Sequence, residues 1–216
     1  MNTMLDNEII IGKDFYLWKN ARIYFQYDEK IDGYCLFDAY GFADDLFIPQ
    51  DINGIQIKCI YGEEFYNGLT SYEKVVVSEN NQNFITIDGI LFSHNKKRLI
   101  LYPPNKKATA YTVPASVNTI SSCSFSYNEY LEKIDFQNGV ESINDYALAW
   151  CKNLLQVTLP QSIKSIGHKA FLGVDKLLTV QYGGCISDWQ NIYISDINND
   201  ALKTAMLLCQ GSIGES

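Results

Sequence analysis

A period of 23 residues runs through the second half of this 216-residue chain, where Leu131, Leu154 and Leu177 mark three successive units. The same spacing relates further sets of apolar residues: Ile134, Val157 and Val180; Val140 and Ile163; Ile143 and Ile166; Leu148 and Phe171. Apolar residues held to one phase of a short period are typical of stacked repeats. Because one unit alone cannot bury its apolar residues, the period predicts a solenoid in which neighbouring coils cover each other.

Each unit carries three groups of inward residues. Ile134 and Phe136 are two apart, which is the period of a strand with one face buried. Val140 and Ile143 form a second inward pair after an Asn-Gly turn, and Ala147 and Leu148 supply the third on a short helical turn. The pattern predicts an α/β repeat solenoid built mostly from short β-strands, with matching side chains stacked in successive coils.

The period divides the chain into three parts, which we predict to be an N-terminal cap at 1–45, repeats at 46–183 and a C-terminal cap at 184–216. The first part has the alternating, aromatic composition of one or two strands, with a turn at Asp32-Gly33. The last part predicts a short turn or helix, a helix at 200–205 capped by Asn199 or Asp200, and a closing apolar strand.

An insertion of about residues 79–107 lengthens one repeat. Asp88-Gly89 stands between two alternating apolar runs, which predicts a β-hairpin, and RLILY at 98–102 predicts a third strand. Before the insertion, the first coil is expected to run from Leu46 to at least Phe65, with Pro49 at the position of the later prolines.

The segments VPASVNTI, LPQSIKSIGHKAFLGV and YALAWCKNL resemble the BspA-type leucine-rich repeat family, over about residues 33–210. Cys151 stands at the family's cysteine position, whereas Gln137 and Leu148 depart from its proline and phenylalanine. The resemblance implies a curved, right-handed leucine-rich-repeat coil with short strands on the concave side. It also implies a bacterial protein, often at the cell surface or secreted, that acts in adhesin-like binding rather than catalysis.

The composition disfavours two classes of partner. The net charge of −8 and the pI near 4.7 repel phosphate, so we expect neither nucleic acid nor an anionic membrane as a partner. No segment has the ~20 apolar residues that a membrane helix requires. The N-terminus carries no signal-peptide pattern, which by that criterion alone predicts a cytoplasmic location.

The six cysteines form no CxxC pair, which argues against a zinc ribbon or a redox motif. We expect most of them to be reduced and buried, acting as small apolar residues. A disulfide framework, which requires an oxidising compartment, is the alternative.

The concave strands are expected to expose the residues that lie between the inward ones, and this row is the usual ligand surface of a solenoid. At its N-terminal end the row has acidic residues, among them Asp44 and Asp45, next to Phe47. The predicted partner-binding residues are Glu132, Lys133, Asp135, Leu155, Gln156, Thr158, Leu178, Thr179 and Gln181. Leu155 and Leu178 either form an apolar patch with Trp189 or are covered by the C-terminal cap.

We predict no catalytic residues, no cofactor and no metal site. The two histidines, His94 and His168, have no nucleophile at a suggestive spacing, and phosphate-loop, GxSxG and HExxH motifs are absent from the sequence. Lysines at 74 and 133 interrupt the acidic residues of the row, which is typical of a solvated face. The basic residues at 96–98 and 106–107 are interpreted as a solvated hairpin edge.

The sequence therefore predicts a non-catalytic binding module that recognises a protein, or a glycan, through its concave face and hairpin. The alternative is a structural or assembly protein that homo-oligomerises through solenoid surfaces. Neither the partner nor the oligomeric state follows from the sequence.

Overall fold

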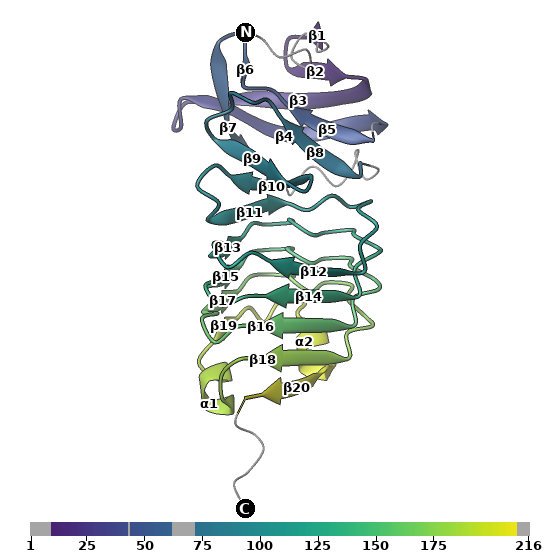
Figure 1. Cartoon of the computed structure of the whole chain (residues 1–216), viewed down its shortest axis with the longest axis vertical. Coiled ribbons are helices and arrows are strands. Elements are labelled where there is room, and N and C mark those ends of the chain that lie inside the picture. Colours follow the sequence, from purple (N-terminus) through teal and green to yellow (C-terminus); the bar gives the residue numbers. More distant parts are fainter. Residues whose placement is uncertain (1–9, 43, 62–71, 211–216) are drawn as a thin grey trace, which may run out of the picture.

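A computed structural model describes residues 10–42, 44–61 and 72–210 of the chain. The molecule is an elongated stack of coils, with a strongly twisted sheet at the N-terminal end and two short helices at the other (Figure 1). Strands make up most of the regular structure, and the described helices are α1 (Ile186–Trp189) and α2 (Asp200–Thr204). The predicted repeat solenoid is confirmed. The domain boundaries at 45 and 183 stay predictions, and the expected end of the first coil near Phe65 lies outside the described residues.

The N-terminal sheet contains six strands in the order β1-β2-β3-β4-β7-β6. Alternate residues of its third strand, Ala21, Ile23 and Phe25, are buried, as the alternating pattern of the sequence requires. Of the one or two strands predicted here, two are present as β2 and β3. The sequence did not signal the two-residue β1 or the ten-residue β4, which follows the turn at Asp32. The bounds are β1 Ile10–Ile11, β2 Phe15–Trp18, β3 Asn20–Asp28, β4 Gly33–Phe42, β6 Asp51–Ile52 and β7 Ile55–Ile60.

One wall of the solenoid is a parallel five-stranded sheet in the order β12-β14-β16-β18-β20. Its strands stack with the predicted phase: Ile134 lies opposite Val157, and Val157 lies opposite Val180. Parallel pairing lets each coil satisfy the backbone groups of the next. The bounds are β12 Ala110–Val113, β14 Lys133–Phe136, β16 Gln156–Leu159, β18 Thr179–Tyr182 and β20 Met206–Cys209.

A second sheet, of order β19-β17-β15-β13-β11-β10-β9, forms another wall of the same coils. Its repeat strands are only two residues long, and in each the second residue, such as Ile120 or Ile143, is buried. These short parallel strands pair in register from β11 to β19. The bounds are β9 Phe84–Ile87, β10 Ile90–Ser93, β11 Arg98–Leu101, β13 Thr119–Ile120, β15 Ser142–Ile143, β17 Ser165–Ile166 and β19 Tyr193–Ile194.

The third wall, which carries Ala147 and Leu148, is a run of tight turns. In three successive coils, two residues of this wall adopt a left-handed backbone conformation, and both sets repeat every 23 residues. The first set is Cys123, Tyr146 and Lys169, and the second is Tyr127, Trp150 and Gly173, with φ between 53° and 68°. Because only glycine adopts this conformation freely, the surrounding packing must hold the other five residues in it.

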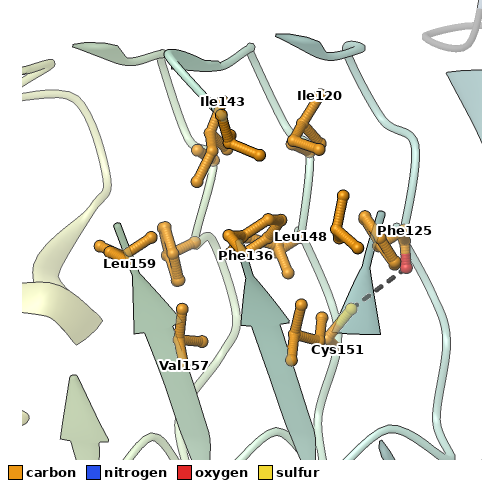
Figure 2. Packing of buried hydrophobic residues seen from close by; sticks show 14 of the residues in the cluster. Ile120, Phe125, Phe136, Ile143, Leu148, Cys151, Val157 and Leu159 are labelled. Carbon is orange, nitrogen blue, oxygen red and sulfur yellow. Dashed lines mark hydrogen bonds between the residues drawn. The ribbon is translucent and has the colours of Figure 1, made fainter. Parts of the chain in front are cut away.

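The core between the walls is a column of stacked side chains (Figure 2). Phe136, Leu148 and Val157 are at most 1% exposed, and Cys151 donates a hydrogen bond through its thiol to the carbonyl oxygen of Phe125 at 3.1 Å. Full burial of each large apolar side chain contributes roughly 1.5–3 kcal/mol. The stacking of coils thus supplies the main stabilisation of the fold.

The predicted hairpin is confirmed, and it lies between two hydrophobic cores. Asp88 and Gly89, with φ of 52° and 72°, form the turn between β9 and β10. Ile90 and Phe92 point into the core of the repeats, whereas Leu91 belongs to a second core beneath the N-terminal sheet. The hairpin is therefore buried on both faces of β10, and a role of the hairpin in binding stays a prediction.

The first coil differs from the prediction, because the N-terminal sheet covers it. Its strands are β5 (Asp45–Ile48) and β8 (Lys74–Val77), and the expected exposure of Asp45 and Phe47 is wrong. The Phe47 ring packs 4.7 Å from the ring of Trp18, centroid to centroid, and the Phe47 carbonyl oxygen accepts a hydrogen bond from the Tyr16 hydroxyl at 2.6 Å. Strand β2 therefore covers the first coil and excludes solvent from it.

Asp45 is held in place by two donors at the end of β2, one from its last residue and one from the turn that follows. The Trp18 indole N–H and the Lys19 ammonium donate to Asp45 Oδ1 at 3.0 and 2.6 Å. Burial by itself would raise the pKa of Asp45, but the hydrogen bonds from Lys19 and Trp18 together outweigh it and hold that pKa below its ordinary value. The carboxylate therefore joins the N-terminal sheet to the solenoid.

Buried asparagines fasten loops to neighbouring coils. Asn128 is fully buried: its side-chain nitrogen donates to the carbonyl oxygens of Pro103, Pro104 and Lys106 at 3.0 to 3.3 Å. Its side-chain oxygen accepts the N–H groups two and three residues later, at 3.0 and 2.8 Å. Asn81 makes similar contacts: its side-chain nitrogen donates to the Pro49 carbonyl oxygen, and its side-chain oxygen accepts the N–H groups two and three residues later. These amides satisfy backbone groups that no strand pairs.

The C-terminal helix is present as predicted, but Asn199 does not cap it with its side chain. The Asn199 amide instead donates to the carbonyl oxygens of Gly167 and Ser195, both at 2.9 Å, and accepts the N–H of Phe171 at 3.0 Å. It acts as another fastening between coils.

Candidate functional site

The exposed side of the five-stranded sheet is the candidate interaction surface, called here the outer face. Two columns of side chains point outward along it, one position on either side of the buried residues of each strand. The first column contains Ala110, Lys133, Gln156, Thr179 and Met206, and the second contains Thr112, Asp135, Thr158, Gln181 and Leu208. Strand pairing therefore brings side chains from five coils into contact range on one rigid surface.

A third column precedes the strands. The Leu155 N–H donates to the Glu132 carbonyl oxygen at 2.8 Å, and the Leu178 N–H donates to the Leu155 carbonyl oxygen at 2.9 Å. These bonds hold the three residues one above another. All nine predicted partner-binding residues thus lie in three adjacent columns, although no observation tests whether they bind a partner.

Charge on the outer face is confined to one coil. Glu132, Lys133 and Asp135 all belong to the β14 coil, whereas β12, β16, β18 and β20 carry no charged residue. In the centre the side chains are neutral, and the Thr158 hydroxyl lies 3.4 Å from the Gln181 side-chain oxygen, as a hydrogen-bond donor to it. The C-terminal end is apolar. From β14 to β20 the face therefore grades from charged through polar to apolar.

The C-terminal cap leaves Leu178 uncovered: its side chain is 64% exposed, while Leu155 is half-buried. The expected partnership with Trp189 is wrong, because the Trp189 ring packs 5.4 Å from the ring of the buried Tyr182, at the other end of β18. Leu178 therefore belongs to the apolar end of the outer face without that tryptophan.

The sequence did not reveal two residues of this apolar end. Met206 and Leu208 are 63% and 44% exposed and continue the two columns beyond Thr179 and Gln181. They follow those residues by 27 positions rather than 23, because α1 and α2 lengthen the last coil. Met206–Cys209 is apolar at all four positions, so the sequence does not separate its exposed residues from its half-buried ones.

The described residues contain one serine–histidine pair. The Ser195 hydroxyl lies 2.5 Å from His168 Nδ1, but Ser195 is only 3% exposed and its oxygen also accepts the Ile197 N–H. No carboxylate in that part of the chain hydrogen-bonds the imidazole. The pair lacks the accessible nucleophile and the oriented base of a catalytic site, and it connects the last repeat to β19.

The remaining sequence candidates are dispersed. Lys106 forms an ion pair with Asp88 and Lys107 forms one with Glu73, both at 2.9 Å. These two lysines therefore do not form one cluster with the basic residues of the β10–β11 turn. No group of three His, Cys, Asp or Glu side chains within residues 10–42, 44–61 and 72–210 is placed to hold a metal ion. Among the described helices, none has the length and apolar character to cross a bilayer.

Two hollows of about 330 and 320 Å³ flank α2, and neither contains a predicted binding residue. The first lies against the turn at Gly173, and the second lies below Trp189 and Leu207 at the end of the core. The outer face is therefore separate from these two hollows.

Comparison with known proteins identifies the repeats. The BspA type leucine rich repeat model matches six copies across residues 102–204. This part of the chain, just under half of it, carries BspA-type leucine-rich repeats. The identification agrees with the parallel, in-register coils, since stacked sheets of this kind are what the repeat requires.

Two solved structures of bacterial leucine-rich repeat solenoids are similar to this chain. A leucine-rich repeat protein from Eubacterium ventriosum has 29% identity and a TM-score of 0.58, over 65% of this chain and 36% of that chain. The pneumococcal vaccine antigen PcpA has 28% identity and a TM-score of 0.56, over 66% of this chain and 40% of that chain. This chain thus matches well under half the length of either. Comparison with curated proteins gives no match.

Proposed function

We propose that the chain is a non-catalytic binding module that recognises a protein partner through the outer face. We equate this surface with the concave face that the resemblance to the family implies. The observation that carries the proposal is the apolar end of the face, where Leu178, directly before β18, and Met206 and Leu208, on the neighbouring β20, are 44–64% exposed. Large apolar side chains gathered on a rigid surface are typical of protein-interaction sites.

Support also comes from the family and the fold. Repeat solenoids use their continuous sheet surfaces to bind other molecules, and the similarity to bacterial leucine-rich repeat proteins favours an adhesin-like role at a bacterial surface or in a secreted form. A glycan is the second ligand class that such a face can serve, through Gln156, Thr158 and Gln181.

The test compares two exposed apolar residues on different sheets. Leu178 and Tyr193 are each 64% exposed, but Tyr193 lies on β19, outside the outer face. Immobilised wild-type protein, Leu178→Asp and Tyr193→Asp are exposed to extracts of the bacterium's natural surroundings, and captured material is measured by quantitative mass spectrometry. The proposal expects Leu178→Asp to lose its partner while Tyr193→Asp retains it.

Equal loss or equal retention in the two variants would exclude the outer face. Circular dichroism spectra must show that both variants are folded, because exposed positions are expected to tolerate the change. Treating the extract with protease or with periodate distinguishes a protein partner from a glycan.

A second copy of the chain is the other candidate partner, favoured by the edge strand β20. Charged residues and proline usually keep an edge strand from pairing with another chain. This strand, Met206–Cys209, has neither. Light scattering tests the idea: wild type would be a dimer, and Leu208→Lys would be a monomer.

A further inference from the structure

Two cysteines lie opposite each other in the N-terminal sheet. The parallel strands β4 and β7 place Cys35 in register with Cys59. A shift in the pairing between Tyr34 and Cys35 produces this register, since without it Lys58 would stand opposite Cys35. The nearby Cys35 thiol also raises the pKa of the Cys59 thiol. The bulge therefore brings two thiols together on one side of the sheet.

The spacing of the two strands suits a covalent bond. Neighbouring strands lie roughly 4.8 Å apart, and disulfides join residues whose Cα atoms are about 4.4–6.8 Å apart. Cys35 is 1% exposed and Cys59 is half-buried, so a reagent meets Cys59 first. The described residues offer no third ligand that would make the pair a metal site.

The surroundings favour a stable bond over a reactive thiol. Burial and then the nearby Cys35 thiol raise the pKa of Cys59 above its ordinary value. The neighbouring Tyr61 hydroxyl donates to the Asp28 carboxylate at 3.4 Å, which adds negative rather than positive charge. A thiol of this kind reacts slowly, because only the thiolate attacks. It is suited to a structural bond rather than to sensing or catalysis.

We propose that Cys35 and Cys59 form a disulfide when the protein is in an oxidising environment, and that this bond locks β4 of the N-terminal sheet to β7. The oxidant is a small-molecule disulfide or a thiol–disulfide oxidoreductase. The Cys59 thiolate attacks the external disulfide and releases one thiol; Cys35 then attacks the Cys59 sulfur and releases the second. Two protein thiols are oxidised, one external disulfide is reduced to two thiols, and the two protons pass to them.

The other four cysteines have different surroundings. The Cys151 thiol donates to a core carbonyl oxygen, and the exposed Cys185 thiol lies 2.9 Å from the Ser187 hydroxyl. The Cys123 thiol donates to the Asp145 carbonyl oxygen at 3.9 Å. Cys209 stands in register with Tyr182, and burial together with the nearby Cys185 raises its pKa. Among the described strands, Cys35 and Cys59 are the cysteines that strand pairing sets opposite each other. The proposed bond does not depend on whether the outer face binds a partner.

The sequence makes the test clear, because each of the six cysteines lies in its own tryptic peptide. Cleavage after Lys58 separates Cys35, in residues 31–58, from Cys59, in residues 59–74. Folded protein is treated with excess oxidised glutathione, its thiols are counted after denaturation, and its non-reduced tryptic peptides are analysed by mass spectrometry. We expect the count to fall from six to four, with peptides 31–58 and 59–74 joined.

The melting temperature of oxidised wild type should rise by roughly 5 °C or more over the reduced form. Cys59→Ser should lose both the linked peptide and this increase, whereas Cys185→Ser should keep both. A count that stays at six, a lasting glutathione adduct on Cys59, or a link between other peptides would overturn the proposal. A linked pair without a rise in melting temperature would refute the locking role.

Discussion

Replacing Asn128 by alanine tests whether single buried amides hold the coils together. Asn128 is fully buried, and its side chain makes five hydrogen bonds, three to carbonyl oxygens of the preceding loop and two from N–H groups of its own turn. Alanine removes the partner of all five backbone groups at once. The loop at residues 103–106 would lose its fastening to the coil.

The loss in free energy of unfolding depends on how many of the five backbone groups remain buried without water as a new partner. Each buried backbone group without a partner costs about 1–3 kcal/mol. If water reaches all but two of the five, the free energy of unfolding falls by about 2–6 kcal/mol. We expect about 3 kcal/mol, which is a large share of the stability of an ordinary domain.

Asn153 provides the matched control. Its side chain also makes two hydrogen bonds between coils, to the Glu129 carbonyl oxygen at 2.6 Å and from the Lys176 ammonium at 2.7 Å, but it is half-exposed. Water can replace both bonds, so Asn153→Ala should cost less than about 1 kcal/mol. Asn128→Asp keeps the volume and the acceptor but sets a carboxylate against three carbonyl oxygens, and should be no more stable than Asn128→Ala.

Urea titration followed by circular dichroism measures the free energy of unfolding of the three variants and the wild type. Similar small losses for Asn128→Ala and Asn153→Ala would show that the buried amide does not fasten the loop, and the reasoning would fail.

Three further predictions concern the core, one turn and one carboxylate. Leu148 is fully buried, so Leu148→Ala should lower the free energy of unfolding by about 2–5 kcal/mol. Leu178 is 64% exposed, so Leu178→Ala should lower it by at most about 0.5 kcal/mol. Urea titration measures both changes. Gly139→Ala should lower the melting temperature, because φ is +116° and a new Cβ would lie 3.0 Å from a backbone oxygen of the preceding coil. Since the pKa of Asp45 is lower in the folded than in the unfolded protein, its contribution is complete above about pH 4 and is lost as the pH falls further; Asp45→Asn should flatten the acid side of a plot of melting temperature against pH.

The sequence predicted the elements whose signal lies in a regular spacing. Ile134, Val157 and Val180 lie in register because a 23-residue period can bury them only by stacking. The turn at Asp88-Gly89 was predictable because this dipeptide adopts positive φ at little cost.

The missed features depend on contacts between distant parts of the chain. Nothing near Phe47 shows that Trp18 and Tyr16 cover it, so its side of the first coil was expected to be exposed. The left-handed conformations of Tyr146 and Trp150 have no glycine to signal them. An asparagine such as Asn128 has the composition of an ordinary turn, and only the loop that packs on it gives it a structural role.

The columns of the outer face could be predicted, like the core, from the 23-residue spacing. The prediction was incomplete because part of the face, like the cover over the first coil, depends on contacts between distant parts of the chain. Gln156 and Thr179 follow from the phase of the strands, once the inward residues are known. Met206 and Leu208 lie beyond two helices that break the period, so only the three-dimensional pairing of β20 with β18 adds them to the outer face.

The register of the coils is the claim on which the core, the outer face and its columns depend. Amide–amide NOEs in the deuterated protein measure it directly, because only protons of paired strands are close enough to give a signal. We predict contacts between residues 23 positions apart, linking Ile134 to Val157 and Val157 to Val180. Strands of these coils linked at other offsets, or paired in antiparallel fashion, would contradict the account.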